Sequence, residues 1–151
     1  MIVTGASRGI GAAIAGKLAG DGCGVIVNYA AEGAESVVSA IRARGGRAEA
    51  VRADVAAPDD VAALFDRAQQ QMGPVTALVN NAGTLGEQRR VDEREADDLA
   101  RLIRVNVVGM RRHLDRVTDC AQVSLAPAGS QRVRLVQVAR TRDLTARGRT
   151  T

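Results

Sequence analysis

A glycine-rich turn stands between the apolar start of the chain and its first helical pattern. The residues of this turn are Thr4-Gly5-Ala6-Ser7-Arg8-Gly9-Ile10-Gly11. Gly5 permits a tight turn, and Gly9 and Gly11 let backbone and ligand approach where a Cβ would collide. At the start of a helix, free N–H groups and the positive end of the helix dipole face an anion. A strand, this turn and a helix in succession therefore predict a loop that holds the phosphates of a dinucleotide.

Apolar segments along the chain alternate between the pattern of a buried strand and the period of a helix. Strands are predicted at residues 1–3, 25–27, 48–55 and 77–79. Helices are predicted at residues 10–20, 34–41 and 58–72. Strands and helices that alternate through short loops form a parallel sheet with right-handed crossovers. The predicted fold class is therefore α/β, a doubly wound parallel sheet of the Rossmann type.

Polar residues and turns follow several of the predicted strands. The glycine turn, Asn28, Asp54 and residues 80–83 all stand at carboxyl ends of strands. In a doubly wound sheet the ligand crevice lies beyond these ends. We therefore expect these residues to meet at one site.

Four of these features resemble the motifs of the short-chain dehydrogenase/reductase family. In chain order they are the Thr-Gly-x-x-x-Gly-x-Gly turn, Asp54-Val55, Asn80-Asn81-Ala82-Gly83 and Asn106. The resemblance covers residues 1 to about 110 and is nearest to 3-oxoacyl-carrier-protein reductases and glucose dehydrogenases. It implies a half-domain over residues 1–110 that binds NAD(P), and hydride transfer between NADP(H) and a carbonyl or alcohol.

The resemblance also implies roles for single residues. Asp54 would bond the adenine amino group, and residues 80–83 would line the cofactor and support the central strand. Asn106 would belong to the catalytic tetrad, where it holds a water in the proton relay. No metal site is expected. The candidate cofactor-binding residues are Thr4, Gly5, Ser7, Arg8, Gly9, Ile10, Gly11, Asn28, Tyr29, Asp54, Val55, Asn80, Asn81, Ala82 and Gly83.

The catalytic pair of the family, Tyr-x-x-x-Lys, is missing from the sequence. Tyr29 is the one tyrosine and has Gly33 four residues later, and Lys17 is the one lysine. Lys17 is expected to be solvated on the first helix. The hydroxyl residues placed where the family serine would come are Ser124, Ser130 and Thr141. None has the family's Val-x-Val-Ser-Ser context, so Asn106 is interpreted as a remnant of the tetrad.

The end of the second predicted strand favours NADP over NAD. Sites that prefer NAD place an acid there to bond the ribose hydroxyls. Here Asn28 and Tyr29 occupy that place, and the nearest acid, Glu32, lies several residues further on. Arg8 in the glycine turn can supply positive charge to a 2′-phosphate. NADP is therefore the expected cofactor, with NAD as the alternative.

A charged helix with one apolar face is predicted from Asp92 to Met110. The face consists of Leu99, Leu102, Ile103, Val107 and Met110. Asn106 lies on this face, where a buried amide needs hydrogen-bond partners. Neighbouring backbone could satisfy it without any catalytic role. The resemblance implies that family members pair through this helix and the next one, so a homo-oligomer with an incomplete interface is expected.

The composition of the chain changes after Gly109. Residues 1–109 hold 12 Lys+Arg and 14 Asp+Glu, a net charge of −2, whereas residues 110–151 hold nine Arg and three Asp, a net charge of +6. Residues 111–151 are interpreted as a divergent, irregular Arg-rich tail with a helix extension over 111–120 and one strand over 132–138. The tail has no lysine and no aromatic residue for base stacking, so nucleic acid is not an expected partner. His113 is expected on the helix surface.

Other features of the sequence indicate a cytoplasmic protein. No apolar run approaches the roughly 20 residues of a membrane span, and no signal-peptide pattern is present. Cys23 and Cys120 lack metal-type spacing and are interpreted as reduced thiols.

Three interpretations of the function stay open: an oxidoreductase, a catalytically inactive NADP sensor or interaction module, and a frameshifted or truncated gene product. The last fits the change after Gly109, because out-of-frame reading of GC-rich DNA gives arginine-rich sequence.

Overall fold

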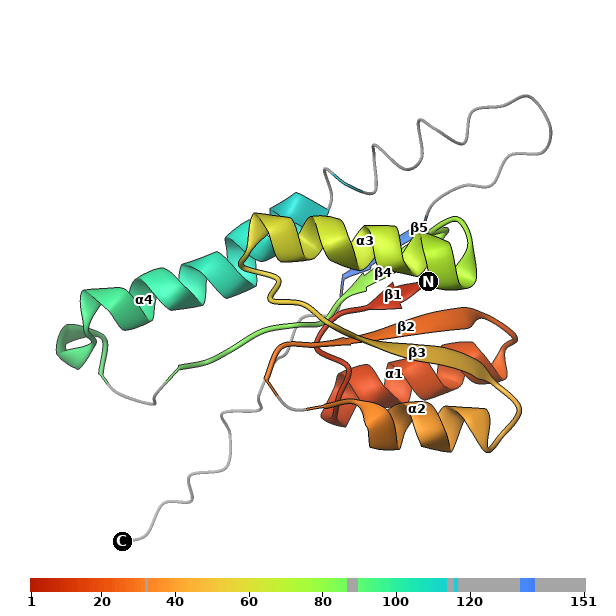
Figure 1. Ribbon diagram of the computed structural model, residues 1–151. Coiled ribbons are helices and arrows are strands. Elements are labelled where there is room, and N and C mark those ends of the chain that lie inside the picture. Colours follow the sequence, from red (N-terminus) through yellow and green to blue (C-terminus); the bar gives the residue numbers. More distant parts are fainter. Residues whose placement is uncertain (32, 87–89, 114–115, 117–133, 138–151) are drawn as a thin grey trace, which may run out of the picture.

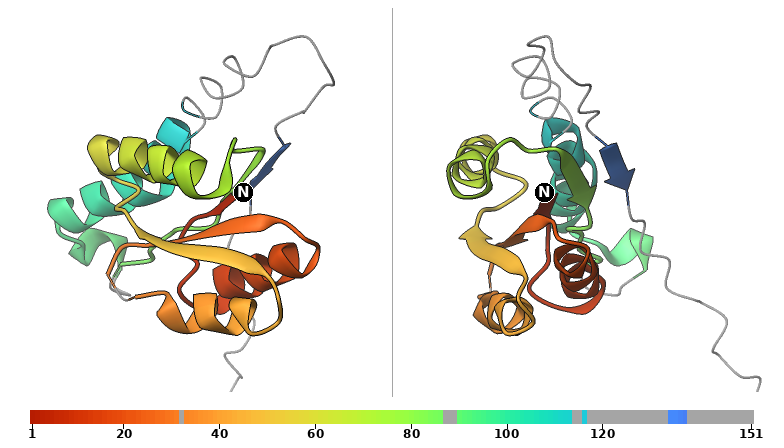
Figure 2. Two further views of the ribbon diagram at one scale, coloured as in Figure 1. Left: turned by 45° about the vertical axis from the view of Figure 1, so that its right-hand side comes forward. Right: turned by 90° about the vertical axis from the view of Figure 1, so that its right-hand side faces the viewer.

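The computed structural model describes residues 1–31, 33–86, 90–113, 116 and 134–137. These residues form one parallel sheet with helices on both faces (Figures 1 and 2). The strands are β1 (Ile2–Val3), β2 (Gly24–Tyr29), β3 (Arg47–Arg52), β4 (Ala77–Asn80) and β5 (Arg134–Gln137). Their order across the sheet is β3-β2-β1-β4-β5, and all neighbours pair in parallel. The predicted doubly wound fold is confirmed.

The helices follow the strands in alternation. They are α1 (Gly9–Gly20), α2 (Glu35–Arg42), α3 (Pro58–Met72), the 3₁₀ turn η1 (Val91–Glu93), α4 (Ala96–Ile103) and the π-helical segment η2 (Arg104–Gly109). Pro58 stands at the first position of α3, with Asp59 and Asp60 in the first turn, as the dipole of that helix favours. Helices α1, α2 and α3 agree with the sequence pattern.

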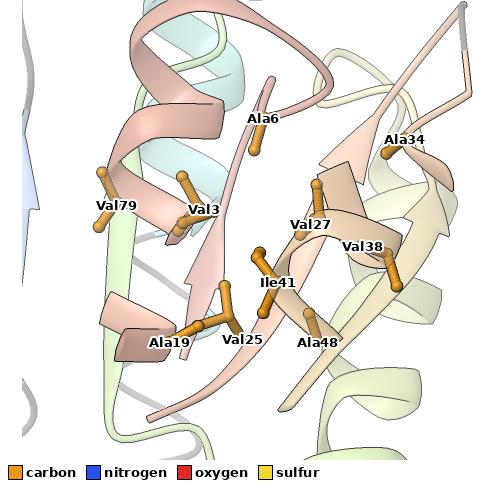
Figure 3. Close-up of a cluster of buried hydrophobic side chains, with 11 residues drawn as sticks. Val3, Ala6, Ala19, Val25, Val27, Ala34, Val38, Ile41, Ala48 and Val79 are labelled. Carbon is orange, nitrogen blue, oxygen red and sulfur yellow. The ribbon is translucent and has the colours of Figure 1, made fainter. Parts of the chain in front are cut away.

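Two hydrophobic cores lie on the two faces of the sheet, because neighbouring residues of a strand point to opposite sides. On one face, Val3 and Val27 pack against Ala19 of α1 and Ile41 of α2 (Figure 3). On the other face, Ile2 and its strand neighbours pack against α3. That second core consists of Ile2, Ile26, Val51, Ala53, Val61, Leu64, Phe65, Ala68, Val75 and Leu78. Burial on both faces explains why the strands read as continuous apolar runs.

The helix predicted from Asp92 begins four residues later. Glu95 has extended backbone angles and precedes the first helical residue, Ala96. Before it, the guanidinium of Arg94 donates to Asp98 Oδ2 at 2.8 Å and to the backbone oxygen of Leu85 at 3.3 Å. These bonds connect the residues before α4 to the first turn of that helix. The periodic pattern therefore placed the start of the helix too far toward the N-terminus.

The predicted apolar face of this helix is not buried. Leu99 and Ile103 are each 48% exposed and Val107 is 54% exposed. No element within the described residues covers them. Beyond Ile103 the helix widens into η2, where Gly109 packs on the loop after β3. A Cβ added at Gly109 would lie 2.7 Å from the backbone oxygen of Val55.

The Arg-rich tail contributes a strand to the sheet. β5 pairs with β4, with Ala77 opposite Arg134 and Asn80 opposite Gln137. This agrees with the strand predicted over 132–138, whose remaining residues lie outside the described part. The helix continues through His113. Predictions on Glu32, on Cys120, Ser124, Ser130 and Thr141, and on the chain beyond Gln137 also fall outside the described residues.

Two negative findings apply to the residues that the structure describes. Within them, no helix is long and apolar enough to cross a membrane. No group of three or more His, Cys, Asp or Glu side chains is arranged to hold a metal ion within the same residues.

Candidate functional site

A crevice of about 470 Å³ opens at the carboxyl ends of the central strands. The glycine turn, the loops after β2, β3 and β4, and one helix wall line it. The lining residues are Gly5, Ser7, Arg8, Asn28, Ala30, Ala31, Ala53, Asp54, Val55, Ala56, Asn81, Ala82, Gly83, Thr84, Arg101, Arg104 and Val105. The predicted convergence of the separate motifs on one place is therefore seen in the structure.

A second, larger groove lies elsewhere on the surface. It measures about 620 Å³, runs between α1 and α2, and shares no lining residue with the crevice. Lys17 lies beside it, exposed as expected, in an ion pair of 2.5 Å with Asp21. None of the predicted cofactor-binding residues lines this groove, so its size alone does not make it the candidate site.

The glycine turn is shaped by close contact with the loop after β4. Gly5 has φ +59°, and a Cβ added there would lie 2.8 Å from Ala82 Cα. A Cβ added at Gly11 would lie 2.5 Å from Asn81 Nδ2. Both glycines are therefore required by the packing of the two loops against each other, in addition to any approach by a ligand.

Hydrogen bonds fix the same two loops together. The buried hydroxyl of Thr4 accepts bonds from the backbone N–H groups of Asn81 and Ala82, both at 3.0 Å. The Asn81 amide donates to the backbone oxygens of Thr4 at 2.8 Å and Gly5 at 2.9 Å. Thr4 does not line the crevice, so its side chain positions the loops that do.

The start of α1 faces the crevice region without a side-chain cap. Arg8 is the N-cap residue, and its side chain forms no capping hydrogen bond. Arg8 itself lines the crevice, and Gly9 and the exposed Ile10 begin the helix behind it. No acidic residue lies in the first turn of α1. The positive end of the helix dipole is therefore available to an anion.

Asn28 joins three strand ends at the floor of the crevice. Its side-chain oxygen accepts from the N–H of Gly5 at 3.3 Å, and its amide donates to the backbone oxygens of Val51 and Ala53 at 3.3 and 3.0 Å. The side chain is buried. The strand end where an acid is expected for NAD is thus a neutral amide engaged with backbone. Tyr29, next along, is half-buried and packs against the core beside α2.

Asp54 is exposed at the rim of the crevice. Its carboxylate accepts from the N–H of Ala56 at 2.8 Å, and its own N–H donates to Asp60 at the start of α3 at 2.8 Å. Val55, which follows it, is buried, and its backbone oxygen lies close to Gly109. These bonds fix the loop after β3 on the side of the crevice nearest α3.

Asn106 lies beside the crevice without lining it. Its side-chain oxygen accepts from the N–H of Thr84 at 2.9 Å, and its amide donates to the oxygen of Thr84 at 2.8 Å. The expected satisfaction by backbone is found, but the expected burial is wrong, because the residue is exposed. Asn106 holds the loop after Gly83 against η2.

His113 is buried, so its predicted place on the helix surface is wrong. Its Nδ1 lies 2.7 Å from Asn80 Oδ1, and its ring centroid lies 6.3 Å from that of Phe65. Burial lowers the pKa of the imidazole to about 4. A neutral ring therefore donates to Asn80 Oδ1, and Asn80 does not line the crevice. His113 stands four residues after Gly109, and this spacing places the two residues on one face of the helix. Since Gly109 is buried, that shared face was the feature that indicated burial of His113.

Several crevice residues were not anticipated from the sequence. Thr84 extends the motif of residues 80–83 by one position. Arg101 and Arg104 belong to the helix that was described from its apolar face, so its charged side chains were not considered as crevice residues. Their spacing of three residues, which puts two cations on one face, was the available signal.

Comparisons with known proteins agree with this arrangement. The chain matches the family profile described as short chain dehydrogenase over residues 1–129. The match continues beyond residue 110, where the recognisable motifs end. An uncharacterised oxidoreductase of Methylorubrum extorquens is 48% identical over 131 residues, which cover 85% of this chain and 51% of the relative. The 3-oxoacyl-[acyl-carrier-protein] reductase of Staphylococcus epidermidis is 42% identical over 121 residues, covering 78% and 48%.

Solved structures show the same relationship. A short chain dehydrogenase from Mycobacterium avium superposes with a TM-score of 0.77 at 32% identity, covering 81% of this chain and 45% of that one. A short chain dehydrogenase from Burkholderia cenocepacia in complex with NADP superposes with a TM-score of 0.74 at 35% identity, covering 85% and 58%. The chain spans about half the length of the curated relatives it matches. Its sequence, fold and site motifs place it in the short-chain dehydrogenase/reductase family, whose members bind nicotinamide dinucleotides.

Proposed function

We propose that the crevice binds a nicotinamide dinucleotide and prefers NADP(H) to NAD(H). The observation that carries the proposal is the uncapped start of α1, which opens with Arg8 onto a crevice at the ends of the strands. Backbone N–H groups and a guanidinium are suitable partners for phosphate. The size of the crevice, about 470 Å³, is within the range of small-molecule sites.

The preference for NADP rests on charge. Asn28 presents no carboxylate that would repel a 2′-phosphate, and Arg8 adds a cation at the rim. Asp54 is the one acidic side chain among the described lining residues, and its carboxylate is engaged by the N–H of Ala56. The NADP-bound relative from Burkholderia supports the same cofactor class.

We propose further that the 151-residue chain binds the cofactor without efficient hydride transfer to a substrate carbonyl. A bound nicotinamide supplies or accepts the hydride, and a protein acid must exchange the accompanying proton. Tyr29 is packed against the core and Lys17 is ion-paired on the outside of α1. Neither lines the crevice. The function supported best is therefore NADP binding within an oxidoreductase framework, as a sensor or interaction module.

Calorimetric titration with NADPH and NADH tests the cofactor preference. The wild type should bind NADPH more tightly, and Arg8→Ala should reduce the difference between the two cofactors. Arg67→Ala is the matched control, because Arg67 is exposed on α3 and does not line the crevice. Equal affinities in the wild type, or a preference that survives in Arg8→Ala, would contradict the charge argument.

An assay of NADPH oxidation tests the absence of turnover. We expect no rate above buffer with ketones, 3-oxoacyl thioesters or quinones. A rate that disappears in Asn106→Ala would show that a proton donor exists in this chain and would overturn the binding-module interpretation.

A further inference from the structure

Two arginines of the helix wall line the crevice in addition to Arg8. Arg101 belongs to α4 and Arg104 is the first residue of η2. Figure 1 shows α4 projecting past the carboxyl ends of the strands, and the turned view in Figure 2 shows the same projection. The helix therefore supplies a wall of the crevice that is separate from the glycine turn.

Both guanidinium groups lack a partner among the residues that the structure describes. Asp97 and Asp98 stand four and three residues before Arg101. Asp98 is engaged at 2.8 Å by Arg94, and Asp97 forms no ion pair with Arg101 among the described residues. The carboxylate of Asp54 accepts from the N–H of Ala56. Two adjacent cations that no carboxylate neutralises repel each other, and an anion between them would remove that cost.

The path of the helix indicates which part of a nucleotide it would meet. Gly109 packs on Val55, and Arg112 donates to the backbone oxygen of Ala56, so the helix follows the loop after β3. In doubly wound folds, the ribose of the adenosine half is bound at the end of the second strand, which β3 adjoins. Val105 and Arg104 line the crevice one turn before Gly109.

We infer that Arg101 and Arg104 form a phosphate-binding pair on the helix wall, contacting a phosphate of the bound nucleotide. The inference rests on the proposed function and deepens it. A guanidinium presents a planar fork of donors that matches phosphate oxygens, and positions three apart on a helix bring two such forks to one group. The phosphate is either the 2′-phosphate of NADP or the pyrophosphate common to NADP and NAD.

The test compares NADPH and NADH binding to Arg101→Ala, Arg104→Ala and the double variant, with Arg67→Ala as control. Both arginines are exposed, so the variants should keep the wild-type circular dichroism and melting temperature. The double variant should bind NADPH about tenfold more weakly. A tenfold change in Kd corresponds to the free energy of about one charge-assisted hydrogen bond at an exposed site. Arg104→Lys should retain part of the affinity, since it keeps the charge.

The two cofactors distinguish the source of the phosphate. A loss confined to NADPH identifies the 2′-phosphate, and an equal loss for NADPH and NADH identifies the pyrophosphate. A double variant that binds both cofactors as tightly as Arg67→Ala overturns the inference while leaving the proposed function intact. A wild-type chain that binds neither cofactor overturns the proposed function, and the inference falls with it.

Discussion

At the scale of single residues, the chain uses polar side chains to position backbone more than to face the crevice. Thr4, Asn28 and Asn81 direct their hydrogen bonds to the ends of strands and to the glycine turn. Asn106 does the same for Thr84, and Asn80 is bonded to His113. Among the described residues, the backbone of the turn and the guanidinium groups of Arg101 and Arg104 are therefore groups that a ligand in the crevice can reach.

His113 makes folding stability depend on pH. Its pKa is about 4 in the folded chain, below the ordinary value of 6.5. Well above pH 6.5 the ring is neutral in both states and contributes no pH dependence. Between pH 6.5 and 4 the unfolded chain binds a proton that the folded chain excludes, so stability falls as pH falls. The loss approaches roughly 3 kcal/mol near pH 4, at 1.36 kcal/mol per unit of pKa shift.

Urea unfolding at several pH values between 4.5 and 7 measures this dependence. His113→Gln keeps a donor for Asn80 and removes the titration, so its free energy of unfolding should vary less with pH than that of the wild type. Other groups titrate equally in both proteins, and the difference between the two slopes isolates His113. Identical slopes would show that folding does not lower the pKa of the imidazole.

At the scale of elements, the site depends on how the loop after β1 meets the loop after β4. Periodicity was sufficient to predict α2, α3 and the strands, because their apolar stripes are buried as their patterns require. It also predicted α1, although the buried residues there are Gly11, Ala15 and Ala19 and Ile10 is 44% exposed. Periodicity did not predict where α4 begins, because hydrogen bonds from the Arg94 side chain hold the preceding residues in a turn. It also failed for His113 and for Arg101 and Arg104, because their surroundings come from segments distant in sequence.

Thr4→Val tests whether the hydroxyl joins the two loops. Valine keeps the shape of the side chain and leaves the N–H groups of Asn81 and Ala82 without their acceptor. We expect a loss of about 1–3 kcal/mol in the free energy of unfolding, the cost of leaving buried donors unsatisfied. Chemical denaturation measures it. Thr76→Val is the control, since Thr76 is half-buried and the N–H groups of Asn81 and Ala82 donate to Thr4 instead. Equal stabilities of the two variants would remove Thr4 from this role.

At the scale of the whole molecule, the described residues build a crevice at the strand ends of a sheet of five parallel strands. Three of the four family motifs were sufficient to predict that crevice, because each stands at the end of a strand, whereas Asn106 lies on η2. The chain covers 51% of its relative from Methylorubrum extorquens, and the family match reaches residue 129. We propose that the nucleotide occupies the crevice at the strand ends and not the larger groove between α1 and α2.

Backbone amide chemical shifts recorded during titration with NADPH test this claim most directly. We expect the largest changes in residues 5–11 and 81–84, with further changes at Arg101 and Arg104. Shifts confined to the groove residues Ala13, Gly20 and Ala40, or no shifts at saturating NADPH, would contradict it.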